Sequence, residues 1–171
     1  MSFERSSGLL LHITSLPSDG GIGDLGPASY EFADFLAAAK QRLWQVLPLS
    51  PTGYGNSPYA ALSAFAANPL LVSLEKLSEW GWIDVKRIAG LSGRSGNIHF
   101  DEVEKQKMPL LEEAARNFLH RHNEAHLTAQ WARFGAYCRM NTSWLNDYAQ
   151  YSMLREKFNF ACWNEWPKEY A

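Results

Sequence analysis

The chain has 171 residues, of which 46% are hydrophobic and 20% are charged, and its formal net charge at pH 7 is -2. This is the composition of a globular domain with its own core, and it excludes an intrinsically disordered chain. Lysine and arginine never form a run longer than a pair, which argues against nucleic acid as a partner.

The sequence indicates a cytoplasmic protein without a membrane partner. No apolar stretch is long enough to span a bilayer, and the first residues lack the basic and apolar pattern of a signal peptide. Cys138 and Cys162 have no metal-binding spacing, so we expect both to be free thiols in a reducing compartment.

The first half of the chain predicts a parallel strand–helix–strand unit. A continuous apolar run at residues 7–13 is typical of a strand buried on both faces, and residues 43–49 predict the second strand. Between them lie a loop with four glycines at 16–26 and a helix that Pro27 opens. Helical spacing predicts a buried stripe on this helix, formed by Ala28, Phe32, Phe35, Leu36 and Ala39.

The rest of the chain predicts mainly helices. Residues 69–74 predict a third short extended segment, and residues 75–80 predict a short helix. A hinge at 91–97, rich in glycine and serine, separates this half from a part that we expect to be helical only. Its predicted helices are one capped by Asp101 with Glu104, a separate one from Pro109 to about His122, one over 127–140, and one over 143–158 capped by Ser143.

Counting strands indicates an incomplete sheet. Two or three parallel strands with helices on one side leave a bare hydrophobic edge, which natural proteins pair, cover or close. We therefore expect the chain to be the opening part of a larger α/β fold whose remaining strands lie elsewhere.

The segment Gly21-Ile-Gly-Asp-Leu-Gly26 has the spelling G-x-G-x-x-G of dinucleotide sites. Its glycines come too far after the first strand to sit on the strand tip, and no acidic residue follows the second strand to bind a ribose. These two departures favour a glycine-shaped loop of a sugar site over a nucleotide site. A plain connector is the alternative.

The histidines do not form a convincing metal site. On a helix only His122 and His126 would share a face, and no carboxylate or thiol completes a tetrahedral set with them or with His120. A solvated helix surface explains them better. His12 ends the first predicted strand, where function gathers in α/β folds, although packing is favoured there over ligand contact.

Glycosidic chemistry requires two carboxylates that face one another across the scissile bond. The candidates are Asp19, Asp24, Glu31 and Asp34, and of these only Asp24 is placed on a loop at the useful end of the sheet. One loop carboxylate is not a pair, so the sequence predicts no catalytic residues in this chain.

Residues 47–69 carry the most informative pattern. They contain hydroxyls and two tyrosine rings but almost no charge, which is the chemistry of a surface that binds a neutral sugar chain. We predict that Tyr54, Ser57 and Tyr59 contact this ligand. The alternative is that Tyr59 packs into the wall of the fold and Tyr54 is merely exposed.

Several long motifs occur in a fixed order along the chain. They are Ser7-Gly-Leu-Leu-Leu-His-Ile-Thr-Ser-Leu-Pro17, Gly21-Ile-Gly-Asp-Leu-Gly26, Trp44-Gln-Val-Leu-Pro-Leu49, Pro51-Thr-Gly-Tyr-Gly-Asn-Ser-Pro-Tyr59, Ser63-Ala-Phe-Ala-Ala-Asn-Pro-Leu70 and Trp163-Asn-Glu-Trp-Pro167. Together they resemble the start of the 4-α-glucanotransferases, which are the amylomaltases or disproportionating enzymes of glycoside hydrolase family seventy-seven.

The resemblance implies an α/β fold that is an incomplete (β/α)8 TIM barrel. Residues 1–90 would be the N-terminal part of the catalytic barrel with the glucan-binding loop, and residues 91–171 a helical insertion subdomain. The parent enzyme would transfer α-1,4-glucan segments between maltooligosaccharides or starch chains by a retaining double displacement. It would need no metal or organic cofactor. This piece would be inactive alone, and its protein partner would be the rest of its own barrel.

The same resemblance assigns roles to individual residues. Tyr59 would line the subsite beside the scissile bond, with Ser57 nearby, and Tyr54 would belong to a secondary glucan groove with Phe100. The chain has Asn56 where many relatives carry Asp, so it lacks a charge there. Two other hypotheses stay open: a noncatalytic glucan-binding module, and a helical interaction domain built on residues 101–158.

Overall fold

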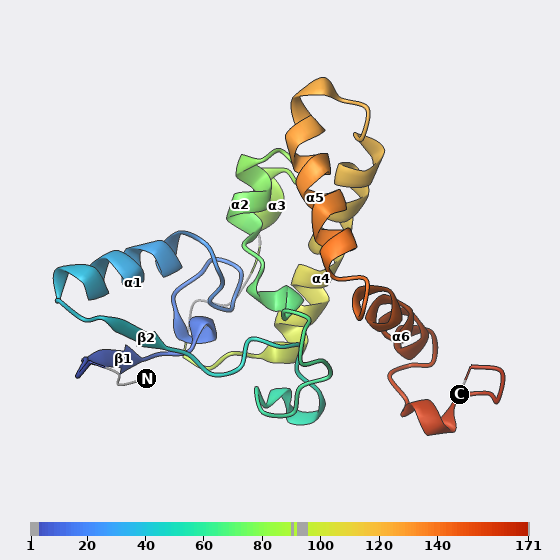
Figure 1. The fold of residues 1–171 in the computed structure, drawn as a ribbon, viewed down its shortest axis with the longest axis horizontal. Coiled ribbons are helices and arrows are strands. Elements are labelled where there is room, and N and C mark those ends of the chain that lie inside the picture. Colours follow the sequence, from blue (N-terminus) through green and yellow to red (C-terminus); the bar gives the residue numbers. More distant parts are fainter. Residues whose placement is uncertain (1–3, 90, 92–95, 171) are drawn as a thin grey trace. The chain divides into compact units, whose positions relative to one another are not determined.

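The fold begins with two short parallel strands joined by a crossover helix. The computed structural model, which describes residues 4–89, 91 and 96–170, pairs β1 (Gly8–Leu10) with β2 (Leu43–Gln45) side by side (Figure 1). The helix α1 (Pro27–Ala38) lies between them in the sequence and has Pro27 in its first turn. The predicted strand–helix–strand unit is therefore confirmed.

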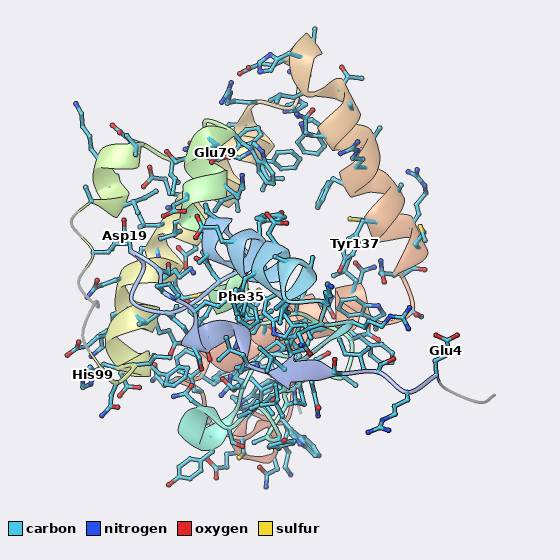
Figure 2. All side chains as sticks on the ribbon, turned by 90° about the vertical axis from the view of Figure 1, so that its left-hand side faces the viewer. Glu4, Asp19, Phe35, Glu79, His99 and Tyr137 are labelled. Carbon is cyan, nitrogen blue, oxygen red and sulfur yellow. The ribbon has the colours of Figure 1, made fainter. Side chains whose placement is uncertain are left out.

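The prediction that the first strand is buried on both faces is wrong. Leu9, Leu10 and Leu43 are all exposed, because the sheet formed by the described residues has only two strands and few elements cover it. The predicted stripe on α1 is only partly buried for the same reason. Leu36 is buried, but Phe35 is exposed (Figure 2).

The predicted extended segment at 69–74 is a helical turn instead. A 3-10 helix spans Pro69–Leu71, and the Asn68 side chain caps it by accepting a hydrogen bond from the Leu70 amide at 2.9 Å. A capping asparagine followed by a proline starts a helix, and this local chemistry overrides the apolar run. The short helix predicted next is confirmed as α2 (Leu74–Glu79), and α3 (Val85–Ile88), which was not predicted, follows it.

One long helix replaces the two that the sequence predicted after residue 100. The helix α4 (Phe100–His120) runs through Pro109, so the prediction of a new helix at this proline is wrong. The predicted cap at Asp101 is also wrong, since His99 precedes the helix and Asp101 lies in its first turn. The helix is continuous because its buried face is continuous; that face consists of Val103, Lys107, Leu110 and Ala114.

Packing divides the chain into two compact units, Met1–Arg121 and His122–Ala171. The second unit contains α5 (Thr128–Met140), α6 (Leu145–Lys157) and two 3-10 helices, Ala125–Leu127 and Trp163–Glu165. Both long helices were predicted. Trp144 occupies the N-cap position of α6, so the predicted Ser143 cap is wrong.

The predicted division of the barrel part from the helical insertion at residue 90 stays a prediction. Its hinge covered residues 91–97, of which 92–95 lie outside the described residues. Within the described chain, no helix combines the length and the hydropathy that crossing a membrane requires.

The core of the first unit lies where the loop after β1 meets the segment around Leu70. One cluster joins Ile13 and Leu16 to Leu71, and a second joins Ile22 to Leu70 and to Val103 of α4. Both clusters therefore pack the glycine-containing loop against the segment that follows the two-tyrosine loop.

We predict that Pro109→Ala stabilises the chain. Proline removes a backbone hydrogen bond inside a helix, and its cost of about 3 kcal/mol is only partly offset by about 1 kcal/mol from restricting the unfolded chain. The free energy of unfolding from urea titration should rise by roughly 1–2 kcal/mol. The control Pro27→Ala, in the first turn of α1, should have little effect. Destabilisation by Pro109→Ala would contradict this explanation.

Candidate functional site

The two predicted tyrosines lie on a loop that presents them to solvent. We call residues 51–66 the ring-bearing loop. Tyr54 is 99% exposed and Tyr59 is 76% exposed, and Ser57 lies between them in the chain. The structure thus brings the three predicted contact residues together on one loop. Their contact with a sugar stays a prediction.

Backbone hydrogen bonds close the ring-bearing loop at its base. Thr52 and Ala61 form an antiparallel bridge, the Gly53 amide donates to the Ala60 carbonyl at 2.7 Å, and the Leu62 amide donates to the Pro51 carbonyl at 2.9 Å. The backbone of the loop is therefore an ordered element rather than a loose connection.

The tip of the loop depends on residues that accept a left-handed backbone. Gly55 has a φ of 70° and Asn56 a φ of 53°, and asparagine is among the few non-glycine residues that adopt this conformation readily. The Thr52 hydroxyl donates to Asn56 Oδ1 at 3.3 Å. Ser57 Oγ accepts from the Tyr59 amide at 3.3 Å, so Ser57 helps to orient Tyr59.

A third ring on the ring-bearing loop was not predicted. Phe65 is 71% exposed, while its neighbour Ala66 is buried. The hydroxyl of Ser63 accepts from both of their amides at 3.1 Å, which fixes a tight turn and directs the phenyl ring outward. The signal available in the sequence was this serine two residues before an aromatic in an otherwise small-residue segment. Phe100, in contrast, is half-buried against the core cluster of Ile22 and Leu70.

Two of the cavities in the described part of the chain lie beside the loop after β1, and that loop borders the larger of these two. This cavity has a volume of about 830 Å³, and its polar lining comes from Thr14, Ser15, Ser18, Asp19 and Asn97. Asp19 is labelled in Figure 2 on this loop. Hydroxyl, amide and carboxylate groups around one cavity suit a polyhydroxylated ligand. The sugar-site role of this loop stays a prediction.

Close packing accounts for the glycines of the G-x-G-x-x-G segment. Gly21 has a φ of 76°, in the left-handed region. A Cβ at Gly23 would strike the backbone of Ile13 and Leu16, and one at Gly26 would lie 2.7 Å from Asp24 Oδ1. Each glycine is thus required by the fold itself, without reference to a phosphate.

Asp24 is not available as a catalytic carboxylate, because it is held by a buried lysine. Lys107 of α4 is 0% exposed, and its Nζ donates to Asp24 Oδ2 at 3.1 Å and to the Leu70 carbonyl at 2.7 Å. Asp24 also accepts from the Gly26 amide and the Ser73 hydroxyl. Sequence reasoning missed Lys107, since nothing local marks a lysine that will be buried.

Burial dominates the electrostatics of this pair. It raises the pKa of Asp24 and lowers the pKa of Lys107, while the attraction between the two charges opposes both shifts. Removing the charges from water therefore outweighs their attraction, which is common for buried ion pairs.

Three of the four candidate carboxylates line the smaller cavity, together with one that was not predicted. Asp19, Asp24 and Glu31 surround a volume of about 210 Å³ with Glu75, whereas Asp34 does not line it. Burial, followed by the charges of Asp24, Asp19 and Glu79, raises the pKa of Glu75.

The histidines lie apart from both cavities. His12 is half-buried, its Nδ1 has no hydrogen-bond partner among the described residues, and burial lowers its pKa. His122 and His126 both precede α5, and His126 lies in the short 3-10 helix Ala125–Leu127. The expectation that the two histidines would share one face of a helix is therefore wrong. Among the described residues, no three histidine, cysteine or acidic side chains are arranged so that they could hold one metal ion together.

We predict that the Asp24–Lys107 pair shows strong coupling in unfolding experiments. Lys107→Met leaves Asp24 buried without its cation and should lower the free energy of unfolding by about 3–5 kcal/mol. The Asp24→Asn/Lys107→Met double variant removes both charges and should recover most of this loss. Urea titration of the variants measures the effect, and losses that simply add would contradict it.

We also predict that Glu75 destabilises the fold at neutral pH. Because its pKa is raised, Glu75 binds its proton more tightly in the folded state than in the unfolded state. The bound proton therefore adds to the free energy of unfolding below the ordinary pKa of 4.5, and this addition is lost as the pH rises through the folded pKa. The melting temperature of Glu75→Gln, measured by circular dichroism, should therefore be higher than that of the parent at pH 7 and equal to it at pH 4. Glu102→Gln, another first-turn glutamate, is the control and should not show this pattern.

Comparisons with known proteins agree on one family. The family model described as 4-alpha-glucanotransferase matches residues 11–171. The chain is 42% identical over 170 residues to a 4-alpha-glucanotransferase of Synechocystis sp., covering 98% of this chain and 33% of that protein. It is 40% identical over 167 residues to one of Thermus thermophilus, covering 98% and 32%.

The structure resembles an amylomaltase from Streptococcus agalactiae solved in complex with acarbose. The TM-score is 0.83 at 34% sequence identity, and the match covers 96% of this chain and 32% of that chain. The chain spans about one third of the length of the curated relatives it matches. On the family match and these relatives together, the chain belongs to the 4-alpha-glucanotransferase family.

Proposed function

We propose that this chain supplies sugar-binding residues to a 4-α-glucanotransferase, which transfers α-1,4-glucan segments between maltooligosaccharides or starch chains. The observation that carries the proposal is the exposure of Tyr54 and Tyr59 on an ordered, uncharged loop. An aromatic face can cover the C–H side of a pyranose, and the phenol can bond its hydroxyls. The acarbose bound to the related amylomaltase supports a sugar as the ligand.

The roles of the ring-bearing loop follow from its geometry and from the family resemblance. Tyr59 would line the subsite beside the scissile bond, and Ser57, which accepts from the Tyr59 amide, would hold it in place. Tyr54 would stack in a secondary glucan groove. Phe65 adds a third exposed ring that could contact the same sugar chain.

The reaction would be a retaining double displacement. A carboxylate attacks the anomeric carbon while an acid protonates the departing glycosidic oxygen, which forms a covalent glycosyl-enzyme. The 4-hydroxyl of an acceptor glucan then attacks the anomeric carbon, and the same acid, now a base, removes its proton. We infer that these carboxylates lie outside the 171 residues, a view supported by the burial of Asp24 against Lys107. We further infer a cytoplasmic location and a reaction without a metal or organic cofactor.

The sheet supports a role as the opening of a (β/α)8 barrel. Leu9 and Leu10 of β1 and Leu43 of β2 are exposed, as expected for strands that pair with and are covered by later parts of a barrel. The rest of this barrel would be the chain's own protein partner.

We predict that the chain binds maltoheptaose weakly and saturably through the ring-bearing loop. Tyr54→Ala and Tyr59→Ala should each raise the dissociation constant roughly ten-fold, about 1.4 kcal/mol per ring, by isothermal titration calorimetry. Tyr137→Ala, which removes an exposed tyrosine of α5, is the control and should not change it. Unchanged affinity in both loop variants would refute the proposed site.

The chain alone should release no glucose from maltotriose, and clear release would contradict the placement of the catalytic carboxylates.

A noncatalytic glucan-binding module is the second candidate. The hydrogen bonds that close the ring-bearing loop join residues of the loop itself, Gly53 to Ala60 and Leu62 to Pro51, which favours a self-contained binding element. A stand-alone module should melt cooperatively and elute as a single species from a sizing column. An opened barrel part should self-associate through the exposed strands β1 and β2 as its concentration rises, so the binding and unfolding measurements are made at concentrations where it is monomeric.

A further inference from the structure

The ammonium group of Lys107 lies where the two loops of the candidate site meet α4. Its Nζ donates to the Leu70 carbonyl at 2.7 Å and to the Asp24 carboxylate at 3.1 Å. Asp24 belongs to the loop after β1, and Leu70 follows the ring-bearing loop. One buried side chain thus connects both loops to the same helix.

Hydrogen bonds connect the backbone at Leu70 to the residues on either side of the ring-bearing loop. Asn68 Oδ1 accepts from the Leu70 amide at 2.9 Å, and the Asn68 amide donates to the carbonyl of Leu49, where the chain enters the loop, at 2.8 Å. The Leu25 amide donates to the Leu71 carbonyl at 2.9 Å. The entrance and the exit of the ring-bearing loop are therefore joined at Asn68, next to the residue that Lys107 holds.

Burial works against both charges of this pair. It shifts the pKa of Asp24 upward and the pKa of Lys107 downward, against the attraction between the two groups. An apolar pair of similar volume would avoid this cost, but it would leave the Leu70 carbonyl without the Lys107 donor. A donor with several N–H groups, however, can fix a carbonyl and a carboxylate from two different loops at once.

We propose that Lys107 is a positioning residue for glucan binding, which holds the ring-bearing loop in the orientation that lets Tyr54 and Tyr59 meet a sugar chain. This inference rests on the proposed function of that loop. It gives Lys107 no contact with the sugar, because the side chain is fully buried.

The test compares variants that keep or lose the hydrogen bond to Leu70. Asp24→Asn retains Lys107 as a donor to the Leu70 carbonyl but leaves its ammonium without a carboxylate, so its affinity is corrected for the folded fraction. Asp24→Asn/Lys107→Met removes both charges and leaves that carbonyl without this donor. Lys105→Met, an exposed lysine of α4, is the matched control. We expect the maltoheptaose dissociation constant to rise at least about ten-fold in the double variant and to stay within about two-fold in the other two.

Amide hydrogen exchange separates positioning from global stability. In the folded double variant, the amides of Gly53 and Leu62 should exchange about ten-fold faster than in the parent, while the Ala39 amide at the end of α1 should not change. A double variant that binds as tightly as the parent overturns the proposal, as does a loss of affinity that follows the folded fraction alone. A double variant that cannot fold also overturns it, because the charges would then be needed for stability.

A parent chain that fails to bind maltoheptaose leads to a different conclusion. If its loop amides are nevertheless protected, the proposed function is wrong, and the exchange measurements alone decide whether Lys107 orders the loop. Different results therefore contradict the proposed glucan binding and the proposed role of Lys107.

Discussion

A buried ammonium holds together three segments that are distant in the sequence. Lys107 Nζ reaches across 83 residues to Asp24 and across 37 residues to Leu70. Around it the two core clusters pack the loop after β1 against the segment that follows the ring-bearing loop. Since burial works against both charges, we attribute the value of this contact to the geometry that it imposes.

This geometry places a neutral aromatic surface on a rigid support. The ring-bearing loop closes through its own backbone hydrogen bonds, and its exit is tied to Leu49 and Leu70 through Asn68. Exposed rings are costly to a free protein in water, so their order on a fixed loop favours a ligand that covers them. The family of the chain makes α-1,4-glucan the natural ligand to propose, and the open edges of β1 and β2 fit a sheet that later strands complete.

Local chemistry made much of the fold predictable. Pro27 marked the start of α1, and α5 and α6 lie within the ranges predicted for the last two helices. The prediction was wrong where two local signals competed. The apolar run after Asn68 favoured a strand, although Asn68 and Pro69 begin a helical turn. Pro109 favoured a helix start, although the buried face of α4 continues through it. For the site, composition singled out the loop of Tyr54, Ser57 and Tyr59, whose sugar contacts stay a prediction. Lys107 could not be found, because its burial depends on partners far away in the chain.

The most direct test of glucan binding at the ring-bearing loop is a map of amide chemical shifts recorded while maltoheptaose is added to the isotope-labelled chain. We expect saturable shifts concentrated in residues 51–66, with smaller changes in the loop after β1 and none in α5 or α6. A folded chain whose spectrum does not change, or whose shifts cluster away from the ring-bearing loop, would contradict binding at this site.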